Sequence, residues 1–148
     1  MHRLSTPEKR QDECEDAGFT LVELLVVLAI IGLIATFAVP QVLRYLESAR
    51  VDSARIQIRN IESAMELYYL DNSRYPASAE GIAALSLEPA DAPRWNGPYL
   101  KNADKLADPW GNPYRYVLED DGRIVITSLG ADGKEGGAGD ARDITNLD

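Results

Sequence analysis

Hydrophobic residues are concentrated in one uninterrupted stretch near the start of the chain, residues 19–39, which reads FTLVELLVVLAIIGLIATFAV. These 21 residues carry a single charge, on Glu23. As an α-helix rising about 1.5 Å per residue, the stretch would be about 30 Å long, the thickness of the hydrocarbon core of a bilayer. A buried helix of a soluble protein rarely runs so long without polar residues. The pattern therefore predicts one transmembrane helix over residues 19–39.

The segment before this stretch, residues 1–18, is polar and mixed in charge. A secretory signal peptide begins with a basic region and ends, after its apolar core, at a cleavage site of small residues. Here the apolar core is followed by Pro40-Gln41 and no such site. We therefore expect the apolar stretch to be retained in the working protein.

Helical periodicity continues beyond the apolar stretch, over residues 40–72. Apolar residues spaced one or two turns apart form a single stripe: Ala54, Ile58, Ile61, Met65 and Tyr68. The stripe predicts a face that packs against the rest of the protein. Tyr75-Pro76 follows the helix and favours its end there, because a residue before proline avoids helical backbone angles. We expect one helix of about fifty residues, with a transmembrane half and an amphipathic half.

The remaining residues, 73–148, predict a small head with antiparallel strands. Turn-forming residues dominate its first part, where we expect a short helix around residues 79–87 with Ser78 as its N-cap. Two runs rich in β-branched and aromatic residues, 114–118 and 123–129, are separated by the acidic turn sequence EDDG. Such a pattern predicts a β-hairpin. The fold class that follows is α+β, with a long N-terminal helix packed on a small antiparallel sheet.

Composition removes most enzyme classes from consideration. The chain carries 15 basic and 24 acidic residues, a net charge of −9, which disfavours binding to nucleic acid. Its single histidine and single cysteine, His2 and Cys14, both lie within residues 1–18. Beyond Gly18 the chain therefore has no group for a Cys/His zinc site, a Ser-His-Asp triad, a cysteine nucleophile or a disulfide. We expect a protein without enzymatic activity.

Glu23 needs its own explanation, because an acidic side chain inside a transmembrane helix costs about 2.5–3.5 kcal/mol. In one interpretation it lies near the helix end and reaches interfacial water. In the other it pairs with a cation. Residues 19–39 contain no Lys or Arg, but a free α-amino group would serve if the chain were cut just before Phe19.

A glycine-rich acidic segment, residues 129–143, reads LGADGKEGGAGDARD. Glycines allow tight turns that direct carbonyl oxygens inward, and carboxylates supply the hard oxygen ligands that Ca²⁺ prefers. The segment matches neither the EF-hand pattern nor the phosphate-binding P-loop. From composition alone, a metal site and a solvated loop are equally consistent with it.

The sequence Gly18-Phe19-Thr20-Leu21-Val22-Glu23 resembles the class III signal of type IV pilins and pseudopilins. The resemblance implies that a prepilin peptidase removes residues 1–18 by cutting between Gly18 and Phe19, and that the new amino group of Phe19 is methylated. It also implies that Glu23 pairs with the amino terminus of a neighbouring subunit and so sets the register of assembly.

Two further motifs, DPWGNPY at residues 108–114 and SLGADG at residues 128–133, resemble those of the major pseudopilins of type II secretion systems. The resemblance implies a pilin-like fold and a structural Ca²⁺ in the C-terminal loop. The ligands that it implies are the side chains of Asp132 and Asp140 and the backbone carbonyl of Leu129, with Gly139 and Asp143 as further candidates.

We therefore expect the main structural subunit of a type II secretion pseudopilus, a helical fibre of identical subunits that drives protein export. The resemblance implies a single-pass protein of the bacterial inner membrane with its head in the periplasm. Its implied partners are further copies of the chain, minor pseudopilins, the inner-membrane platform and prepilin peptidase. A type IV pilin or a minor pseudopilin is the alternative. A calcium-dependent hydrolase using Asp132 and Asp140 is a third hypothesis, supported only by the acids of the loop.

Overall fold

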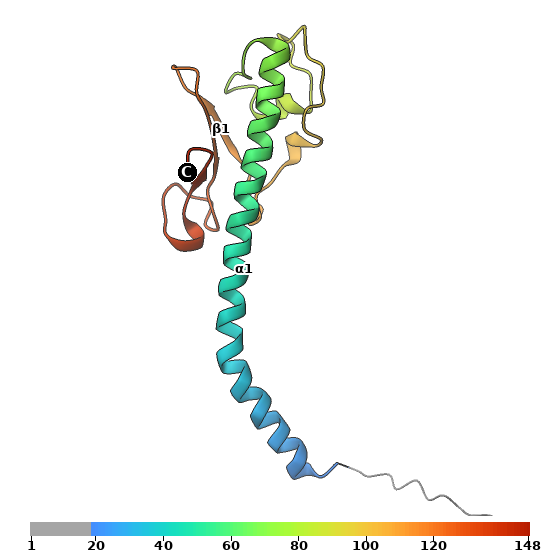
Figure 1. Ribbon diagram of the computed structural model, residues 1–148, viewed down its shortest axis with the longest axis vertical. Helices are drawn as coiled ribbons and strands as arrows, with labels where there is room; N and C mark the ends of the chain where they lie inside the picture. Colours follow the sequence, from blue (N-terminus) through green and yellow to red (C-terminus); the bar gives the residue numbers. More distant parts are fainter. Residues whose placement is uncertain (1–18) are drawn as a thin grey trace, which may run out of the picture. The chain divides into compact units, whose positions relative to one another are not determined.

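The structure, a computed structural model, describes residues 19–148, apart from the side chain of Asp140. One α-helix, α1, spans Leu21–Asn72 and is 52 residues long (Figure 1). It confirms the helix of about fifty residues that the sequence predicts. The predicted leader, residues 1–18, lies outside the described residues. The chain divides into two compact units, of which the first ends at Pro40 and the second comprises Gln41–Asp148.

The described part of the first unit is helical and apolar along its whole length. The best 18-residue window of α1 has a mean hydropathy of 2.7, and none of that window is buried within the chain. Large apolar side chains such as Leu21, Phe37 and Val39 are exposed. By length and composition, this part of α1 is able to cross a membrane.

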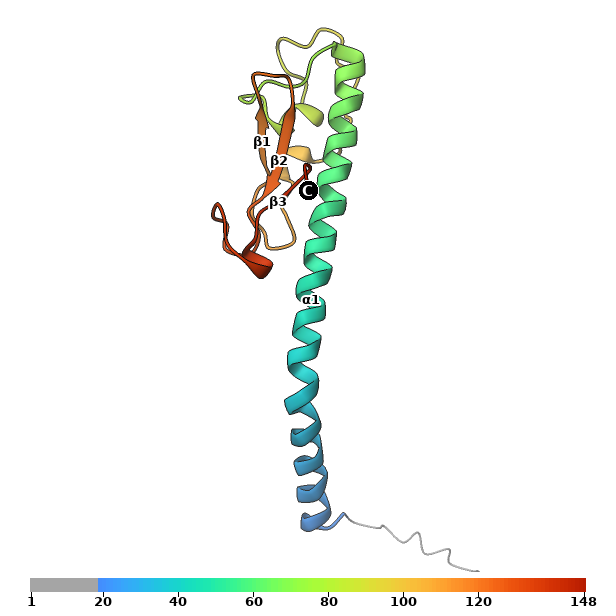
Figure 2. The same cartoon turned by 60° about the vertical axis from the view of Figure 1, so that its left-hand side comes forward.

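The second unit, Gln41–Asp148, is called the head from here on, and it includes the rest of α1 in addition to residues 73–148. It contains a three-stranded antiparallel sheet (Figures 1 and 2). The strands are β1 at Arg115–Leu118, β2 at Ile124–Ser128 and β3 at Ile144–Thr145, in the order β1-β2-β3. Short 3-10 turns occur at η1, Ile82–Leu85, η2, Ala103–Lys105, and η3, Gly139–Ala141. The predicted hairpin is confirmed, with Leu118 opposite Ile124 at its closed end.

The core of the head lies between α1 and the inner face of the sheet. All five residues of the predicted apolar stripe are buried, and Tyr68 is fully so. From the sheet, Ile124, Ile126 and Ile144 are buried against this stripe. This packing follows from the sequence, because side chains on one face of a helix repeat about every 3.6 residues and those on one face of β2 repeat every two residues.

The predicted helix at residues 79–87 is wrong. Only the four residues of η1, Ile82–Leu85, are helical, and they form a 3-10 turn. Gly81, directly before this turn, has a φ of 62°, which a continuous α-helix does not accommodate. Ser78 is not the N-cap either, because its hydroxyl oxygen accepts a hydrogen bond from the backbone N–H of Leu118 at 3.0 Å. The hydroxyl thus caps the free edge of β1 rather than a helix.

Candidate functional site

The glycine-rich loop, residues 129–143, leaves the sheet at the end of β2 and returns to it as β3. Its two ends are held side by side, because Ser128 and Ile144 are partners in the β2–β3 register. Within the loop, Gly137 has a φ of 96°, and a Cβ at this position would lie 2.3 Å from the carbonyl oxygen of Ala141. Any other residue there would force the loop to move. The loop is therefore a closed element with a defined path.

A buried carboxylate fixes the start of this loop. Asp108 is 5% exposed, and its Oδ1 accepts hydrogen bonds from the backbone N–H groups of Trp110 and Asn112, at 3.1 and 2.8 Å. Its Oδ2 accepts a hydrogen bond from the hydroxyl of Ser128 at 2.6 Å, and the N–H of Gly130 donates to that same hydroxyl at 3.3 Å. One side chain thus connects the turn at residues 108–112 to the end of β2.

The side chain of Asn112 adds a second connection to the loop. Its Nδ2 donates to the carbonyl of Gly130 at 2.7 Å. A Cβ on Gly133 would lie 3.1 Å from the Oδ1 of Asn112, so the loop also passes close over this amide. In the sequence, residues 108–114 and 128–133 are linked only because both resemble motifs of the same family. The structure shows why they occur together, since each holds the other in place.

Among the predicted calcium ligands whose side chains the structure describes, Asp143 is the one whose placement best fits a bound cation. Its Oδ2 accepts a hydrogen bond from the N–H of Gly136 at 3.0 Å. Its Oδ1 is buried and has no hydrogen-bond partner among the described residues. A buried acceptor without a donor is costly unless a cation or water meets it. Leu129 and Asp143 both line a hollow of about 240 Å³ beside the sheet.

The other predicted ligands lie differently. Asp132 is exposed, and its Oδ1 accepts a hydrogen bond from the N–H of Lys134 at 3.1 Å. Gly139 begins the η3 turn, and the side chain of Asp140 lies outside the described part. Among the described residues, no three acidic, histidine or cysteine side chains gather as a metal cluster would. The structure therefore brings Leu129 and Asp143 together and leaves Asp132 apart from them.

An ion pair that sequence reasoning missed lines the same hollow. Arg115, on β1, donates to the carboxylate of Glu135 in the loop. Both side chains are at least half exposed and both line the hollow. The Arg115 guanidinium holds the pKa of the Glu135 carboxyl below its ordinary value. All side-chain donors of this hollow other than Arg115 are oxygens, a set that suits calcium and not zinc.

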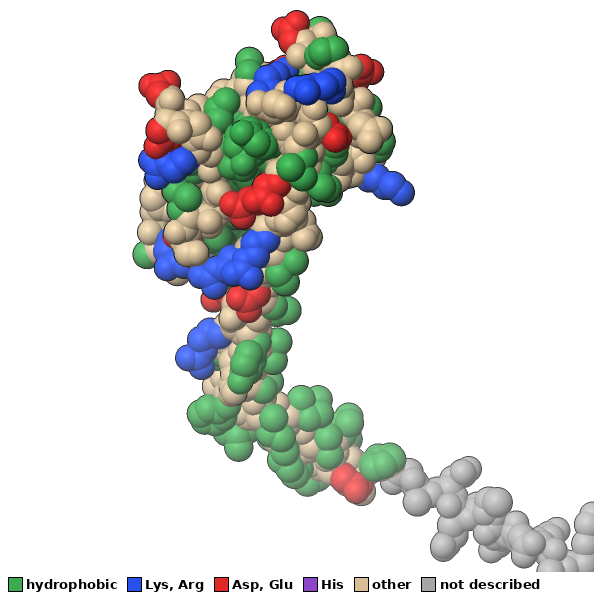
Figure 3. Space-filling model, turned by 45° about the horizontal axis from the view of Figure 1, so that its top comes forward, with side chains coloured by type: hydrophobic (Ala, Val, Ile, Leu, Met, Phe, Trp, Pro, Cys, Tyr) green, Lys and Arg blue, Asp and Glu red, His purple; other side chains and the backbone are tan. Residues whose placement is uncertain are grey.

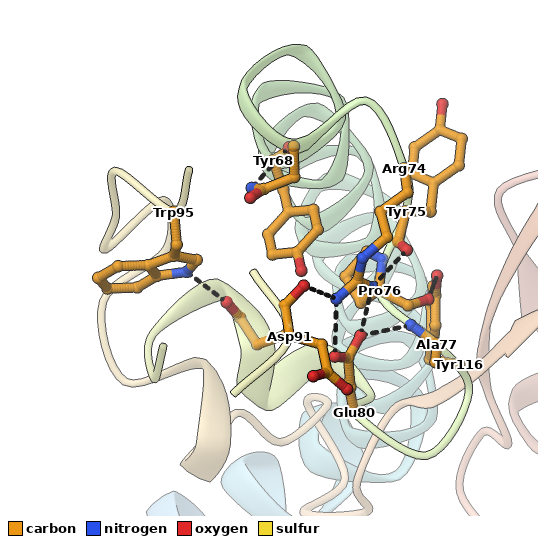
Figure 4. Close-up of polar contacts among 11 residues, drawn as sticks. Tyr68, Arg74, Tyr75, Pro76, Ala77, Glu80, Asp91, Trp95 and Tyr116 are labelled. Atoms are coloured by element: carbon orange, nitrogen blue, oxygen red, sulfur yellow. Dashed lines mark hydrogen bonds and ion pairs between the residues drawn. The ribbon is translucent and has the colours of Figure 1, made fainter. Parts of the chain in front are cut away.

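A second polar cluster, also not predicted, lies where α1 ends (Figure 4). Arg74 donates to both carboxylate oxygens of Glu80, at 2.7 and 2.9 Å, and to the backbone carbonyl of Asp91 at 3.2 Å. Glu80 also accepts the N–H of Ala77 at 2.7 Å. The hydrogen bond from Arg74 is the largest cause of a lowered pKa of the Glu80 carboxyl. The cluster holds residues 73–91 against the end of the helix.

The last residues of the chain are held by one amide. The Nδ2 of Asn146 donates to the Glu62 carboxylate on α1 at 2.9 Å and to the carbonyl of Ile124 at 3.1 Å. Its Oδ1 accepts the N–H of Ile126 at 3.0 Å. Asn146 therefore joins helix, sheet and C-terminal segment.

At the other end of the described chain, Glu23 lies in the first turn of α1. Its N–H donates to the Oγ1 of Thr20 at 3.1 Å, so that Thr20 caps the helix and Glu23 stands at the N3 position. A carboxylate at this place also interacts favourably with the helix dipole. The structure thus supplies a local reason for an acid here. Its pairing with an amino terminus stays a prediction.

A long apolar helix whose second half packs on a small antiparallel sheet, with a closed loop between the last strands, defines the pilin-like class of proteins. Comparison with known proteins narrows the class. Residues 41–147 match the family model "Type II secretion system (T2SS), protein G", and residues 15–39 match the prokaryotic N-terminal methylation motif. The chain belongs to the type II secretion protein G family.

Individual relatives agree with this assignment. The chain is 42% identical over 139 residues to the type II secretion system core protein G of Pseudomonas aeruginosa, covering 90% of this chain and 96% of that protein. It is 43% identical over 136 residues to the protein of the same name from Vibrio cholerae, with 89% and 92% covered. The crystal structure of the major pseudopilin from the type 2 secretion system of enterohaemorrhagic Escherichia coli matches with a TM-score of 0.56 and 30% identity, covering 69% of this chain and 90% of that one. The resemblance drawn from the sequence is confirmed.

Proposed function

We propose that this chain is the main structural subunit of a type II secretion pseudopilus. The observation that carries the proposal is an apolar helix segment that the chain itself leaves uncovered. Residues 21–39 expose nearly all their large side chains, while the head has a complete core of its own. Apolar surface of this extent is stable only in lipid or against other proteins. A subunit stored in a membrane has this surface in lipid, and a subunit in a fibre has it buried against further copies of the chain.

The proposed role is mechanical and involves no turnover. Subunits are held in the inner membrane by residues 19–39 with the head in the periplasm, and are released from it as the fibre grows. Prepilin peptidase is the proposed processing enzyme, because residues 15–39 carry the methylation motif. Minor pseudopilins and the inner-membrane platform are the proposed assembly partners. Growth of the fibre would push exported proteins outward.

The test of this role is assembly of the full chain in cells that supply prepilin peptidase and the inner-membrane platform. We expect fibres that shear from the cells and that consist of this chain, as seen by electron microscopy and immunoblotting. The matched control is the same cell without the platform, in which the processed chain should stay in the membrane fraction. A processed chain that never leaves the membrane fraction in complete cells would contradict the proposal.

We also propose that the glycine-rich loop holds one Ca²⁺. Asp143 and the carbonyl of Leu129 would serve as ligands at the hollow. Asp132, which lies apart from them in the structure, and Asp140 are the further ligands that the family resemblance implies. The supporting observations are the buried, unpartnered Oδ1 of Asp143 and the side-chain oxygens that line the hollow beside Arg115. Bound calcium would hold the loop in one conformation, so that every head presents the same surface to its neighbours.

The calcium proposal is tested by thermal melting of the head from Gln41 onward, with calcium and with chelator. A ligand at one hundred times its Kd adds about 2.7 kcal/mol, which raises the Tm of a domain of this size by roughly 10–20 °C. Magnesium should substitute poorly, because it demands octahedral geometry and holds its waters. Asp132→Ala, Asp140→Ala and Asp143→Ala should each remove the difference, while Asp120→Ala in the hairpin turn should keep it. If the Tm of the head is the same in calcium and in chelator, the calcium proposal is contradicted and the loop is only a solvated loop.

A further inference from the structure

Charge is divided unequally within the head. Residues 41–60 of α1 carry four arginines and two acids, a net charge of +2, whereas residues 61–148 carry a net charge of −8. Figure 3 shows Lys and Arg side chains gathered along the lower edge of the head on the visible face. Copies that assemble side by side can therefore place the basic part of one against the acidic part of another.

Two of the arginines, Arg55 and Arg59, form a pair one helical turn apart. They line a hollow of about 380 Å³ together with Ile58, Glu62 and three residues of the C-terminal segment. Among the described residues, the two arginines make a single ion pair, between Arg55 and Asp52 at 3.7 Å, and this pair lies on the exposed surface. Such a pair contributes little to stability. Arg59 makes none within the described residues and is exposed.

The acidic counterpart lies in the loop that follows η1. Glu88 and Asp91 line a hollow of about 340 Å³, whose other walls include Leu87 and Pro89. Both acids are exposed, and neither carboxylate has an ion pair or hydrogen bond to the described residues. Their position is nevertheless fixed, because Arg74 holds the carbonyl of Asp91 at 3.2 Å. Leu87 is 58% exposed and leaves apolar surface beside the two charges.

We propose that this hollow receives the side chains of Arg55 and Arg59 from a second copy of the chain. An arginine has an apolar stem and a planar charged head, and the hollow offers an apolar wall and two carboxylates to match them. Glu80, a third acid of the hollow, is already bound by Arg74, so Glu88 and Asp91 are the acceptors. The inference rests on the proposed fibre, because it requires identical copies that lie parallel.

The distance along the helix excludes this contact within a single copy of the chain. Asp91 lies level with the end of α1, since Arg74 contacts its carbonyl and the neighbouring Arg94 contacts the carbonyl of Asn72 at 3.1 Å. Arg59 is thirteen residues before Asn72, or about 20 Å along the axis at 1.5 Å per residue. A parallel second copy displaced by about 20–25 Å along the axis brings Arg55 and Arg59 to the hollow. Such a contact is heterologous and leads to an open fibre, not a closed dimer.

The test exchanges the charges in the full chain and measures sheared fibres. Asp91→Arg alone and Arg59→Asp alone should each reduce the fibre yield at least about tenfold, since like charges then face each other. Together, the two substitutions should restore the yield to within about threefold, because the pair is re-formed with its charges exchanged. Both side chains are exposed, so the Tm of the head should not change.

The matched control is Arg50→Asp, which removes an arginine from a different face of the same helix and should not be rescued by Asp91→Arg. Unchanged fibre yield in either single variant, or a double variant no better than the singles, would overturn the contact. If the unmodified chain forms no fibres under the same conditions, it is the proposed function that fails, and the two failures are thus distinguished.

Discussion

The buried carboxylate of Asp108 leads to the sharpest prediction about stability. Asp108→Ala removes the acceptor of three hydrogen bonds, those from the N–H groups of Trp110 and Asn112 and from the hydroxyl of Ser128. The Ser128 side chain is fully buried, so water cannot replace the lost acceptor without a rearrangement. The turn at residues 108–112 and the end of β2 then lose their shared anchor.

The magnitude follows from the number of groups left without a partner. A buried donor that loses its acceptor costs about 1–3 kcal/mol, and the two backbone donors are only partly shielded from water. We expect a total loss of about 2–5 kcal/mol. For a domain of about 100 residues, each kcal/mol lowers the Tm by roughly 4–8 °C, so the variant should melt at least about 8 °C below the unmodified head.

The assay is thermal and urea unfolding of the head from Gln41 onward, with Asp120→Ala as a control that removes an exposed carboxylate. A double-mutant cycle with Ser128→Ala isolates the contact between the two side chains and should give a coupling of about 1 kcal/mol or more. Calcium should also stabilise Asp108→Ala less than the unmodified head, because the loop has lost its anchor. If Asp108→Ala melts within about 2 °C of the unmodified head, the network does not hold the loop as described.

Three further predictions concern processing, assembly and pH. Gly18→Val should block the cut before Phe19, and a mature protein that still begins there would contradict the proposed signal. Glu23→Val should insert into membranes at least as well as the unmodified chain, because a costly charge is removed, yet should fail to form fibres. Normal fibres would leave only the interaction of the Glu23 carboxylate with the helix dipole. The hydrogen bond from Arg74 lowers the pKa of the Glu80 carboxyl below its ordinary value of 4.5. The ionised carboxylate therefore stabilises the head above pH about 4.5, and this stabilisation is lost as the pH falls through the lowered pKa. Glu80→Gln should therefore cost about 1–3 kcal/mol at pH 7 and less at pH 3, and urea unfolding curves that shift equally at both pH values would refute this.

The elements with a strong internal period could be predicted from the sequence. The stripe from Ala54 to Tyr68 identifies both the helix and the face that packs, because a buried helical face must repeat about every 3.6 residues. The hairpin is similarly visible, since its strands are rich in β-branched residues and its turn is acidic and ends in glycine. Both follow from local sequence, and both are observed.

Elements that depend on distant partners could not be predicted. The side chain of Ser78 is a good N-cap by local rules, but it is used by Leu118, forty residues away. β3 has only two residues, Ile144–Thr145, and is a strand because β2 lies beside it. Asn146 carries no signal in the sequence that would reveal its contact with Glu62, eighty-four residues before it.

Composition leaves the glycine-rich loop open between a metal site and a solvated loop, and it is the family resemblance that implies calcium, with Asp132 and Asp140 ahead of Asp143 as ligands. By residue type alone, Asp132 and Asp143 do not differ, as each is an aspartate in a glycine-rich run. The structure separates them, because Asp143 points an oxygen into buried space and Asp132 accepts a bond from its own turn. Such a difference depends on the path of the backbone, which glycines leave open until the whole loop is folded.

The proposed function requires that the chain is processed and stored as a pseudopilin. Mass spectrometry of the protein extracted from membranes of cells that contain prepilin peptidase tests this most directly. We expect a chain that begins at Phe19, with one methyl group on its amino nitrogen and without residues 1–18. A protein that keeps these residues in such cells, or that begins after the apolar stretch, would contradict it.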